Sequence, residues 1–264
     1  MPELPEVEMQ RRYVEAHALG QEIRGVGAAD AGVLSGVTRK DLRRALTGWR
    51  FVKTYRHGKW LFVGVDSGPW LVMHFGMTGE LLYYGGEHNP THIRFRVDFR
   101  NGARLAFIDP RKFGEISLTE SPPLFLAARK WGPDPTQPGF DREAFRAALR
   151  GRTGRLKSVL LNQRVIAGIG NLYADEMLFQ AGLHPDTRAG DLKRSTIDAL
   201  FDAMQAVFAA SLAVGTDYAS LPERFLLLYR DFSGVCPKCG RVLASAVVGG
   251  RTTRYCARHQ RRRS

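Results

Sequence analysis

The three cysteines of this 264-residue chain lie close together near its C-terminus, and they constrain the fold more than any other feature. Cys236 and Cys239 are followed by Cys256 and His259, a spacing of C-x2-C-x16-C-x2-H. Each pair can place two ligands on one tight turn, so that four ligands meet in the tetrahedral geometry of a zinc site. Three thiolates and one imidazole leave no open coordination position. The spacing therefore predicts one structural Zn²⁺ ion per chain, and the odd number of cysteines weakens the alternative of disulfide bonds.

A stretch rich in proline and glycine divides the remaining sequence in two. Residues 132–140 have a composition typical of a linker. Before the linker, residues 1–131 begin with a predicted helix that has Pro5 at its first position. Apolar and polar side chains then alternate from Ile93 to Phe99, which is typical of a half-buried strand, and Asn101-Gly102 predicts a two-residue hairpin turn after it.

Beyond the linker the apolar side chains recur at helical spacing. Ser195 and Asp198 resemble a capping box at the start of one helix, and Asn171 is a candidate cap for an earlier helix. The cysteine pairs lie in short strand-like segments. The sequence therefore predicts an α+β chain in which a helix and strands (1–131) are followed by helices (141–232) and a metal-binding hairpin with a basic tail (233–264).

The charge of the chain favours a nucleic-acid partner. The chain has 39 Lys and Arg against 26 Asp and Glu, a net charge of +13, and no acidic residue follows Cys236. Each contact between such a surface and a phosphate releases condensed counterions. Met1–Glu8 does not resemble a signal peptide, and no uninterrupted apolar stretch reaches membrane-spanning length. We therefore expect a soluble, cytoplasmic protein with no membrane partner.

Several motifs, taken together and in this order, resemble one family, the formamidopyrimidine-DNA glycosylase and endonuclease VIII family of base-excision repair. They are the cysteine cluster and five segments: Met1–Glu8, His57–Lys59, His74–Gly79, Asp109–Gly114 and Ala167–Glu176. The resemblance implies an N-terminal catalytic β-sandwich with a leading helix. It further implies a helix–two-turns–helix domain and a β-hairpin zinc finger. The implied partner is damaged double-stranded DNA, the implied location is the nucleoid through DNA binding, and a monomer is the simplest expectation.

The chemistry of the N-terminus agrees with this resemblance. Once Met1 is removed, Pro2 is a secondary amine with a pKa of about 8, so part of it is uncharged near neutral pH. Attack of this amine on a sugar C1′ atom would expel the base and yield an iminium ion. The iminium acidifies neighbouring protons, so β,δ-elimination can break the strand. Glu3 is placed to protonate the sugar ring oxygen or to shuttle protons. By resemblance, Lys59 reaches the phosphate or the damaged nucleotide and assists catalysis.

The family pattern also implies which residues hold the DNA. His74, Lys157, Asn171 and Arg251 are expected to face the DNA backbone, whereas Glu6 and Glu176 are expected to have supporting roles. A damaged base must leave the stack before its sugar is attacked, which leaves a hole in the duplex. The resemblance assigns Met77 to fill this hole, Phe113 to wedge the neighbouring step and Arg111 to bond the orphaned base.

The sequence departs from the family in ways that leave lesion preference open. His259 replaces the usual fourth cysteine, and Asn162 replaces a common aspartate. Purine-type members carry a loop with a Thr-Leu-Arg-Asp-like element over the extruded base, and the corresponding stretch here, residues 214–224, lacks Leu-Arg-Asp. Formamidopyrimidines and abasic lesions fit such a reduced cap better than 8-oxoguanine does. Two alternatives have no glycosylase chemistry: a non-catalytic zinc-finger protein that recognises damaged DNA, and a zinc-stabilised RNA or ribosome-associated factor.

Overall fold

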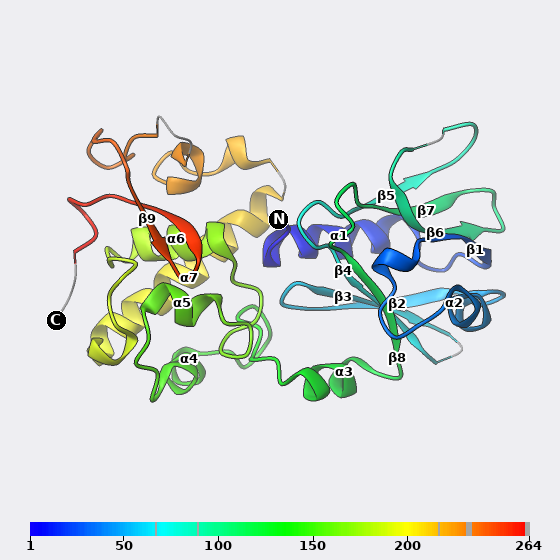
Figure 1. Ribbon diagram of the computed structural model, residues 1–264, viewed down its shortest axis with the longest axis horizontal. Helices are drawn as coiled ribbons and strands as arrows, with labels where there is room; N and C mark the ends of the chain where they lie inside the picture. Colours follow the sequence, from blue (N-terminus) through cyan, green and yellow to red (C-terminus); the bar gives the residue numbers. More distant parts are fainter. Residues whose placement is uncertain (67, 89, 216, 231–233, 262–264) are drawn as a thin grey trace. The chain divides into compact units, whose positions relative to one another are not determined.

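The chain forms two compact units, Met1–Lys130 and Trp131–Ser264. The computed structural model describes residues 1–66, 68–88, 90–215, 217–230 and 234–261. The boundary between the units falls at the start of the proline-rich stretch (Figure 1). Thr216, Arg262, Arg263 and the predicted boundary between residues 232 and 233 lie outside the described residues.

The first unit begins with helix α1, Leu4–His17. Glu3 precedes the helix, and the Glu6 carboxylate accepts a hydrogen bond from the backbone N–H of Glu3 at 2.7 Å. This bond satisfies one of the amide groups that lack a partner at a helix start. Pro5 occupies the second helical position, one later than predicted, because the helix already begins at Leu4.

Two four-stranded antiparallel sheets follow and confirm the expected β-sandwich (Figure 1). The first has the order β2 (Phe51–His57), β3 (Trp60–Val65), β4 (Trp70–His74) and β8 (Glu115–Thr119). The second has the order β1 (Ile23–Ala29), β6 (Ile93–Phe99), β7 (Arg104–Ile108) and β5 (Glu80–Tyr84). One apolar core contains residues of both sheets, including an edge-to-face pair of Phe51 and Phe99 with ring centroids 6.1 Å apart.

Short helices complete this unit. They are η1 (Ala31–Val33), α2 (Arg39–Leu46) and α3 (Pro122–Arg129). Helix α2 begins with a capping box in which Thr38 and Asp41 bond each other's backbone N–H. Helix α1 packs against β2, β3 and β5, which fixes the N-terminus of the chain on the sandwich.

The hairpin between β6 and β7 is one residue longer than predicted. The N–H of Phe99 bonds the carbonyl of Ala103 at 2.9 Å, so the turn contains Arg100, Asn101 and Gly102. Gly102 has a φ of +87° at the third turn position. Three-residue hairpin turns place a left-handed residue there, and glycine adopts that conformation without strain.

The second unit is helical and ends in a two-stranded hairpin (Figure 1). Its helices are α4 (Arg142–Leu149), α5 (Leu156–Leu161), α6 (Asn171–Gln180), η2 (Ala189–Asp191), α7 (Arg194–Val214), η3 (Tyr218–Ser220) and η4 (Leu226–Tyr229). Strands β9 (Ala244–Val248) and β10 (Arg251–Tyr255) form the hairpin. Gln163 holds the connection between α5 and α6 through hydrogen bonds to the carbonyls of Leu161 and Ile169 and from the N–H of Gly168.

Two predicted helix caps are wrong. Helix α7 begins at Arg194, so Ser195 lies inside the helix, and Asp198 instead makes a two-bond contact with Arg146 of α4. Asn171 is the first residue of α6 rather than its cap, a position held by Gly170. Asp198 and the Asn171 amide nitrogen, which the local pattern assigns to the helix starts, contact Arg146 and the Thr252 carbonyl, both distant in sequence.

Helix α7 is the described segment that bears on the expectation about uninterrupted apolar stretches. An 18-residue stretch of this 21-residue helix has a mean hydropathy of 1.5, so by length and composition alone the helix is apolar enough to cross a membrane, although Asp198 and Asp202 interrupt it. The predicted apolar face is confirmed at Leu200, Met204, Val207 and Phe208, which are buried. The helix packs against α4 and α6, and its Asp198 and Asp202 pair with arginines of α4.

Candidate functional site

The predicted nucleophile and its acid lie at the start of helix α1. The Glu3 side chain is buried at 1% exposure, whereas Pro2 is half-buried. The bond from the Glu3 N–H to Glu6 fixes the peptide group that joins Pro2 to Glu3. Glu6 was expected to have a supporting role, and its carboxylate makes a contact that suits one: it holds the backbone of Glu3, the residue that follows Pro2.

Lys59 lies in the turn between β2 and β3. His57 and Trp60 are paired across the two strands, so Gly58 and Lys59 form a two-residue hairpin turn. Gly58 has a φ of +55°, a left-handed conformation that glycine adopts without strain. The Lys59 side chain is 9% exposed, which is low for a lysine and is not the solvated surface charge that a lone lysine usually is.

His74 ends β4, the next strand of the same sheet. Burial lowers the pKa of His74 to about 4, and the positive charge of Lys59 acts in the same direction. Its Nδ1 atom accepts a hydrogen bond from the N–H of Gly76 at 3.2 Å, so the neutral ring carries its proton on Nε2. The ring packs against Trp60 at a tilt of 44°, with ring centroids 4.8 Å apart. His74 can thus offer a neutral N–H donor to an acceptor such as a phosphate oxygen.

Met77, Arg111 and Phe113 lie in two loops that are in contact with each other. Met77 is 38% exposed and Phe113 is 55% exposed, which is unusual for large apolar side chains. The Arg111 guanidinium lies 4.9 Å from the centre of the Phe113 ring. The loops touch at Gly76, where a Cβ atom would come within 2.4 Å of the Phe113 carbonyl carbon. A side chain at position 76 would therefore separate the two loops.

Asp109 joins these loops, a role that its motif does not predict. It is fully buried. Its Oδ1 atom accepts from the Thr78 hydroxyl at 2.7 Å and from the Arg111 N–H at 3.2 Å, and its Oδ2 atom accepts from the Gly114 N–H at 2.8 Å. The sequence signal that could have identified Asp109 is a carboxylate directly before a proline in an otherwise basic loop, since aspartate in such a position often bonds the backbone of the turn.

Lys157 lies inside the helical unit, whereas the family pattern predicts that it faces DNA. Its side chain is fully buried, and Nζ lies 2.6 Å from Oδ1 of Asp175 and 2.6 Å from the Thr253 hydroxyl. The other oxygen of Asp175 accepts from Arg230 and from the backbone N–H of Arg254, the latter at 3.0 Å. One carboxylate therefore connects α5, α6, the segment after η4 and strand β10.

Asn171 and Arg251 lie near the same hairpin. The Asn171 side chain donates from Nδ2 to the Thr252 carbonyl at 3.0 Å. Gly249 and Gly250 form the turn between β9 and β10 with φ values of +60° and +71°, which matches the type I′ turn of tight hairpins. Arg251 follows this turn directly and is exposed. Its position leaves the guanidinium accessible to a phosphate.

The cysteine cluster is assembled as the spacing predicts. One ligand atom from each of Cys236, Cys239, Cys256 and His259 lies within 4.8 Å of the others, so the group can hold a metal ion. The Nε2 atom of His259 is buried and has no hydrogen-bond partner among the described residues, as expected for an atom reserved for a metal. Burial raises the pKa of the Cys236 thiol to about 11, a cost that a bound cation offsets.

The chain carries its predicted site residues on both units. Pro2, Glu3, Lys59, His74 and the Met77, Arg111 and Phe113 loops belong to the first unit, and Lys157, Asn171, Arg251 and the metal cluster belong to the second. The structure describes their local geometry. Their roles toward DNA stay predictions.

Comparison with known proteins identifies relatives along nearly the whole chain. Residues 1–116 match the formamidopyrimidine-DNA glycosylase N-terminal domain, and residues 131–222 match its helix–two-turns–helix domain. A formamidopyrimidine-DNA glycosylase of Halorhodospira halophila is 34% identical over 271 residues, covering 99% of this chain and 100% of the relative. One of Desulforamulus reducens is 35% identical over 277 residues, with 99% of both chains covered.

Solved structures give the same result. The Lactococcus lactis protein named Fpg or MutM, in complex with DNA containing Fapy-dG, has a TM-score of 0.90 at 30% identity, with 98% of this chain and 100% of that chain covered. A MutM structure in complex with DNA containing carbocyclic 8-oxo-G has a TM-score of 0.89 at 31% identity, with 99% and 100% covered.

Proposed function

Because the chain belongs to the formamidopyrimidine-DNA glycosylase family, we propose that the amine of Pro2 attacks the sugar of a damaged nucleotide in double-stranded DNA. The protein is a DNA glycosylase of base-excision repair. The observation that carries the mechanism is that the Glu3 side chain is buried next to Pro2 in sequence, while the backbone N–H of Glu3 is held by the Glu6 carboxylate at the start of α1.

The reaction begins after removal of Met1 exposes the proline nitrogen. The lone pair of this nitrogen forms a bond to C1′, and the base departs with the electrons of the glycosidic bond. Loss of the amine proton and opening of the sugar ring give an iminium ion, for which Glu3 supplies a proton to the ring oxygen. The iminium then accepts electrons as the C2′ proton leaves and the 3′ phosphate is expelled. A second elimination releases the 5′ phosphate.

The remaining site residues hold the DNA in this proposal. Lys59 supports the reaction from its turn, and the neutral N–H of His74 donates to a backbone phosphate. The exposed side chains of Met77 and Phe113 enter the base stack while the guanidinium of Arg111 bonds the unpaired base. Their exposure supports this assignment, because burial in the stack recovers the apolar surface that the free protein leaves in water.

In the second unit we assign the metal as zinc. The ligand set of three thiolates and one imidazole, the short ligand separations and the unpartnered Nε2 of His259 fit a tetrahedral structural ion. The metal would fix the β9–β10 hairpin that presents Arg251 to a phosphate. In this proposal Lys157 and Asn171 support the position of the hairpin, because both side chains bond residues of β10.

The lesion class follows from the segment after α7. Here η3, Tyr218–Ser220, is closed by a bond from the Ser220 hydroxyl to Asp217 at 2.6 Å. The segment lacks the Leu-Arg-Asp element of purine-type relatives. We therefore propose that formamidopyrimidine and abasic duplexes are processed faster than an 8-oxoguanine duplex, and a panel of these substrates with an oxidised pyrimidine tests this order. The protein acts as a monomer on nucleoid DNA in the cytoplasm in this proposal.

Borohydride trapping tests the chemistry directly. Processed wild-type protein should form a covalent adduct with an abasic duplex, and protein whose N-terminal amine is blocked by acetylation should lose that adduct while it still binds the duplex. A wild-type protein that binds damaged DNA without forming an adduct or cleaving the strand would support the non-catalytic alternative. Preference for structured RNA over the damaged duplex would support an RNA-associated factor.

A further inference from the structure

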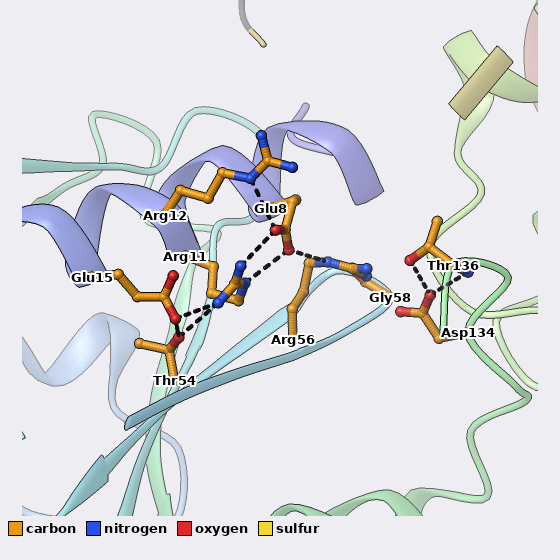
Figure 2. A network of polar contacts seen from close by, with 9 residues as sticks. All are labelled: Glu8, Arg11, Arg12, Glu15, Thr54, Arg56, Gly58, Asp134 and Thr136. Carbon is orange, nitrogen blue, oxygen red and sulfur yellow. Dashed lines mark hydrogen bonds and ion pairs between the residues drawn. The ribbon is translucent and has the colours of Figure 1, made fainter. Parts of the chain in front are cut away.

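Glu8 of helix α1 and Arg56 of strand β2 connect the helix of the nucleophile to the turn of Lys59. The Nε atom of Arg56 donates to Oε2 of Glu8 at 3.1 Å, and its Nη1 atom donates to the carbonyl of Gly58, also at 3.1 Å (Figure 2). The Arg56 side chain is only 3% exposed and that of Glu8 is 12% exposed. Because both groups are shielded from water, this contact is screened much less than a surface ion pair.

The carbonyl that Arg56 holds belongs to the peptide bond between Gly58 and Lys59. Gly58 has a φ of +55°, and Lys59 is not among the described non-glycine residues with positive φ, so the turn matches type II′. Rotation of this central peptide would give the other primed turn, in which Lys59 itself needs a positive φ. That conformation is strained for lysine, and it would also withdraw the carbonyl from Arg56. The hydrogen bond therefore favours one backbone conformation of the turn from which the Lys59 side chain extends.

Glu8 is held in its charged form on the opposite side of the contact. Burial alone would raise the pKa of Glu8, but hydrogen bonds and charge from Arg11, with the charge of Arg56, outweigh it and lower the pKa. Arg11 bonds both carboxylate oxygens at 2.8 and 2.9 Å, and Arg12 adds a contact at 3.2 Å (Figure 2). A guanidinium can donate to Glu8 and to the Gly58 carbonyl at once in a fixed geometry, whereas a lysine ammonium at the same position lacks that planar fork.

We propose that Glu8 and Arg56 are positioning residues for the glycosylase reaction. They fix the Gly58–Lys59 turn relative to the helix that carries Pro2 and Glu3, and they act on the damaged nucleotide only through Lys59. This inference rests on the proposed function, because it concerns the direction of a side chain that assists the reaction at Pro2.

A double-mutant cycle separates positioning from general support of the fold. The single-turnover rate of base release from a formamidopyrimidine duplex is measured for wild type, Arg56→Lys, Lys59→Met and the double variant. Arg56→Lys keeps the charge beside Glu8 but not the second donor to Gly58. We expect it to slow the wild type about 10-fold, the size expected for a misplaced catalytic group, and to change the Lys59→Met background less than about 2-fold. Equal losses in both backgrounds, or no loss in the wild-type background, would overturn the proposal.

Two further variants test whether the loss of rate comes from the turn or only from a change of charge around Glu8. Glu8→Gln should reproduce the loss seen with Arg56→Lys, because it removes the anion that holds the guanidinium. Arg12→Gln removes another cation from Glu8, and since the contact of Arg12 with Glu8 lies away from the turn, it should change the rate less than about 2-fold. An Arg12→Gln rate as low as that of Arg56→Lys would show that charge around Glu8 matters rather than the turn. Urea unfolding shows which variants are folded. A wild-type protein that releases no base would refute the proposed function itself.

Discussion

The Nζ atom of Lys157 lies 2.6 Å from Oδ1 of Asp175, and both side chains are fully buried in the helical unit. Asp175 also accepts from Arg230 and from the backbone of β10, so one carboxylate compensates two cations and anchors the metal-binding hairpin. Charges removed from water in this way are tolerated only while their partners remain in place.

Asp175→Asn should therefore destabilise the helical unit. Loss of the anion leaves Lys157 buried without compensation, and we expect the free energy of unfolding in urea to fall by about 3–5 kcal/mol. Asp202→Asn is the control, because it breaks an exposed pair with Arg142 and should cost less than about 1 kcal/mol. Similar losses for both variants would contradict the structural role of the buried pair.

Asp109→Asn should weaken recognition of the lesion. An amide offers one acceptor oxygen where the carboxylate offers two, so Thr78, Arg111 and Gly114 can no longer all be satisfied. We expect about 10-fold weaker binding to a duplex that contains a tetrahydrofuran abasic analogue, measured by fluorescence anisotropy. Binding to undamaged duplex should change little, since only the loops of Met77 and Phe113 are affected. Unchanged lesion binding would show that the loops hold without this carboxylate.

Stability at mildly acidic pH should depend on His74. Burial lowers its folded-state pKa from the usual 6.5 to about 4, so the unfolded chain binds more protons between these values. The stability of the fold that depends on a neutral His74 ring is fully present above pH 6.5 and is lost as the pH falls toward 4. Its upper limit is about 3 kcal/mol in the free energy of unfolding. His74→Gln should flatten the dependence of Tm on pH across that window. A mutant whose Tm falls with acid as steeply as that of the wild type would exclude His74 as the cause.

Metal content should follow the cysteine cluster. Elemental analysis should give about one zinc per chain, and Cys256→Ser should lose the metal and weaken DNA binding, because the hairpin with Arg251 is no longer fixed. The β-sheet signal in the circular dichroism of the variant should persist, because the sandwich lies in the unit Met1–Lys130 and the cluster belongs to the other unit. Normal DNA binding by metal-free protein would contradict this view of the hairpin.

The sequence predicted features that depend on local spacing more accurately than those that depend on distant partners. The strand from Ile93 to Phe99 and the metal cluster were predicted correctly, because alternation and ligand spacing are encoded within a few residues. The cap predicted at Ser195 is wrong, since α7 begins at Arg194 and Asp198 pairs with Arg146, 52 residues earlier in the chain.

The same distinction applies to the candidate site. Pro2, Glu3 and Lys59 were identified from motifs, but the supporting side chains were not. Arg56 carries no motif of its own, and its importance becomes visible only when β2 folds against α1. The interior position of Lys157 was equally hidden, since its partner Asp175 lies on another helix.

The contact between Gly76 and the Phe113 backbone has a consequence for how tightly the protein can hold a lesion in the proposed function. In that proposal both loops enter the duplex, and loops that are already packed together lose little conformational entropy when they do so. The cost of ordering them is met once, during folding, rather than at every base pair that is tested. Preorganised loops raise the affinity for the site that they enter, and the absence of a Cβ atom at Gly76 makes their close packing possible.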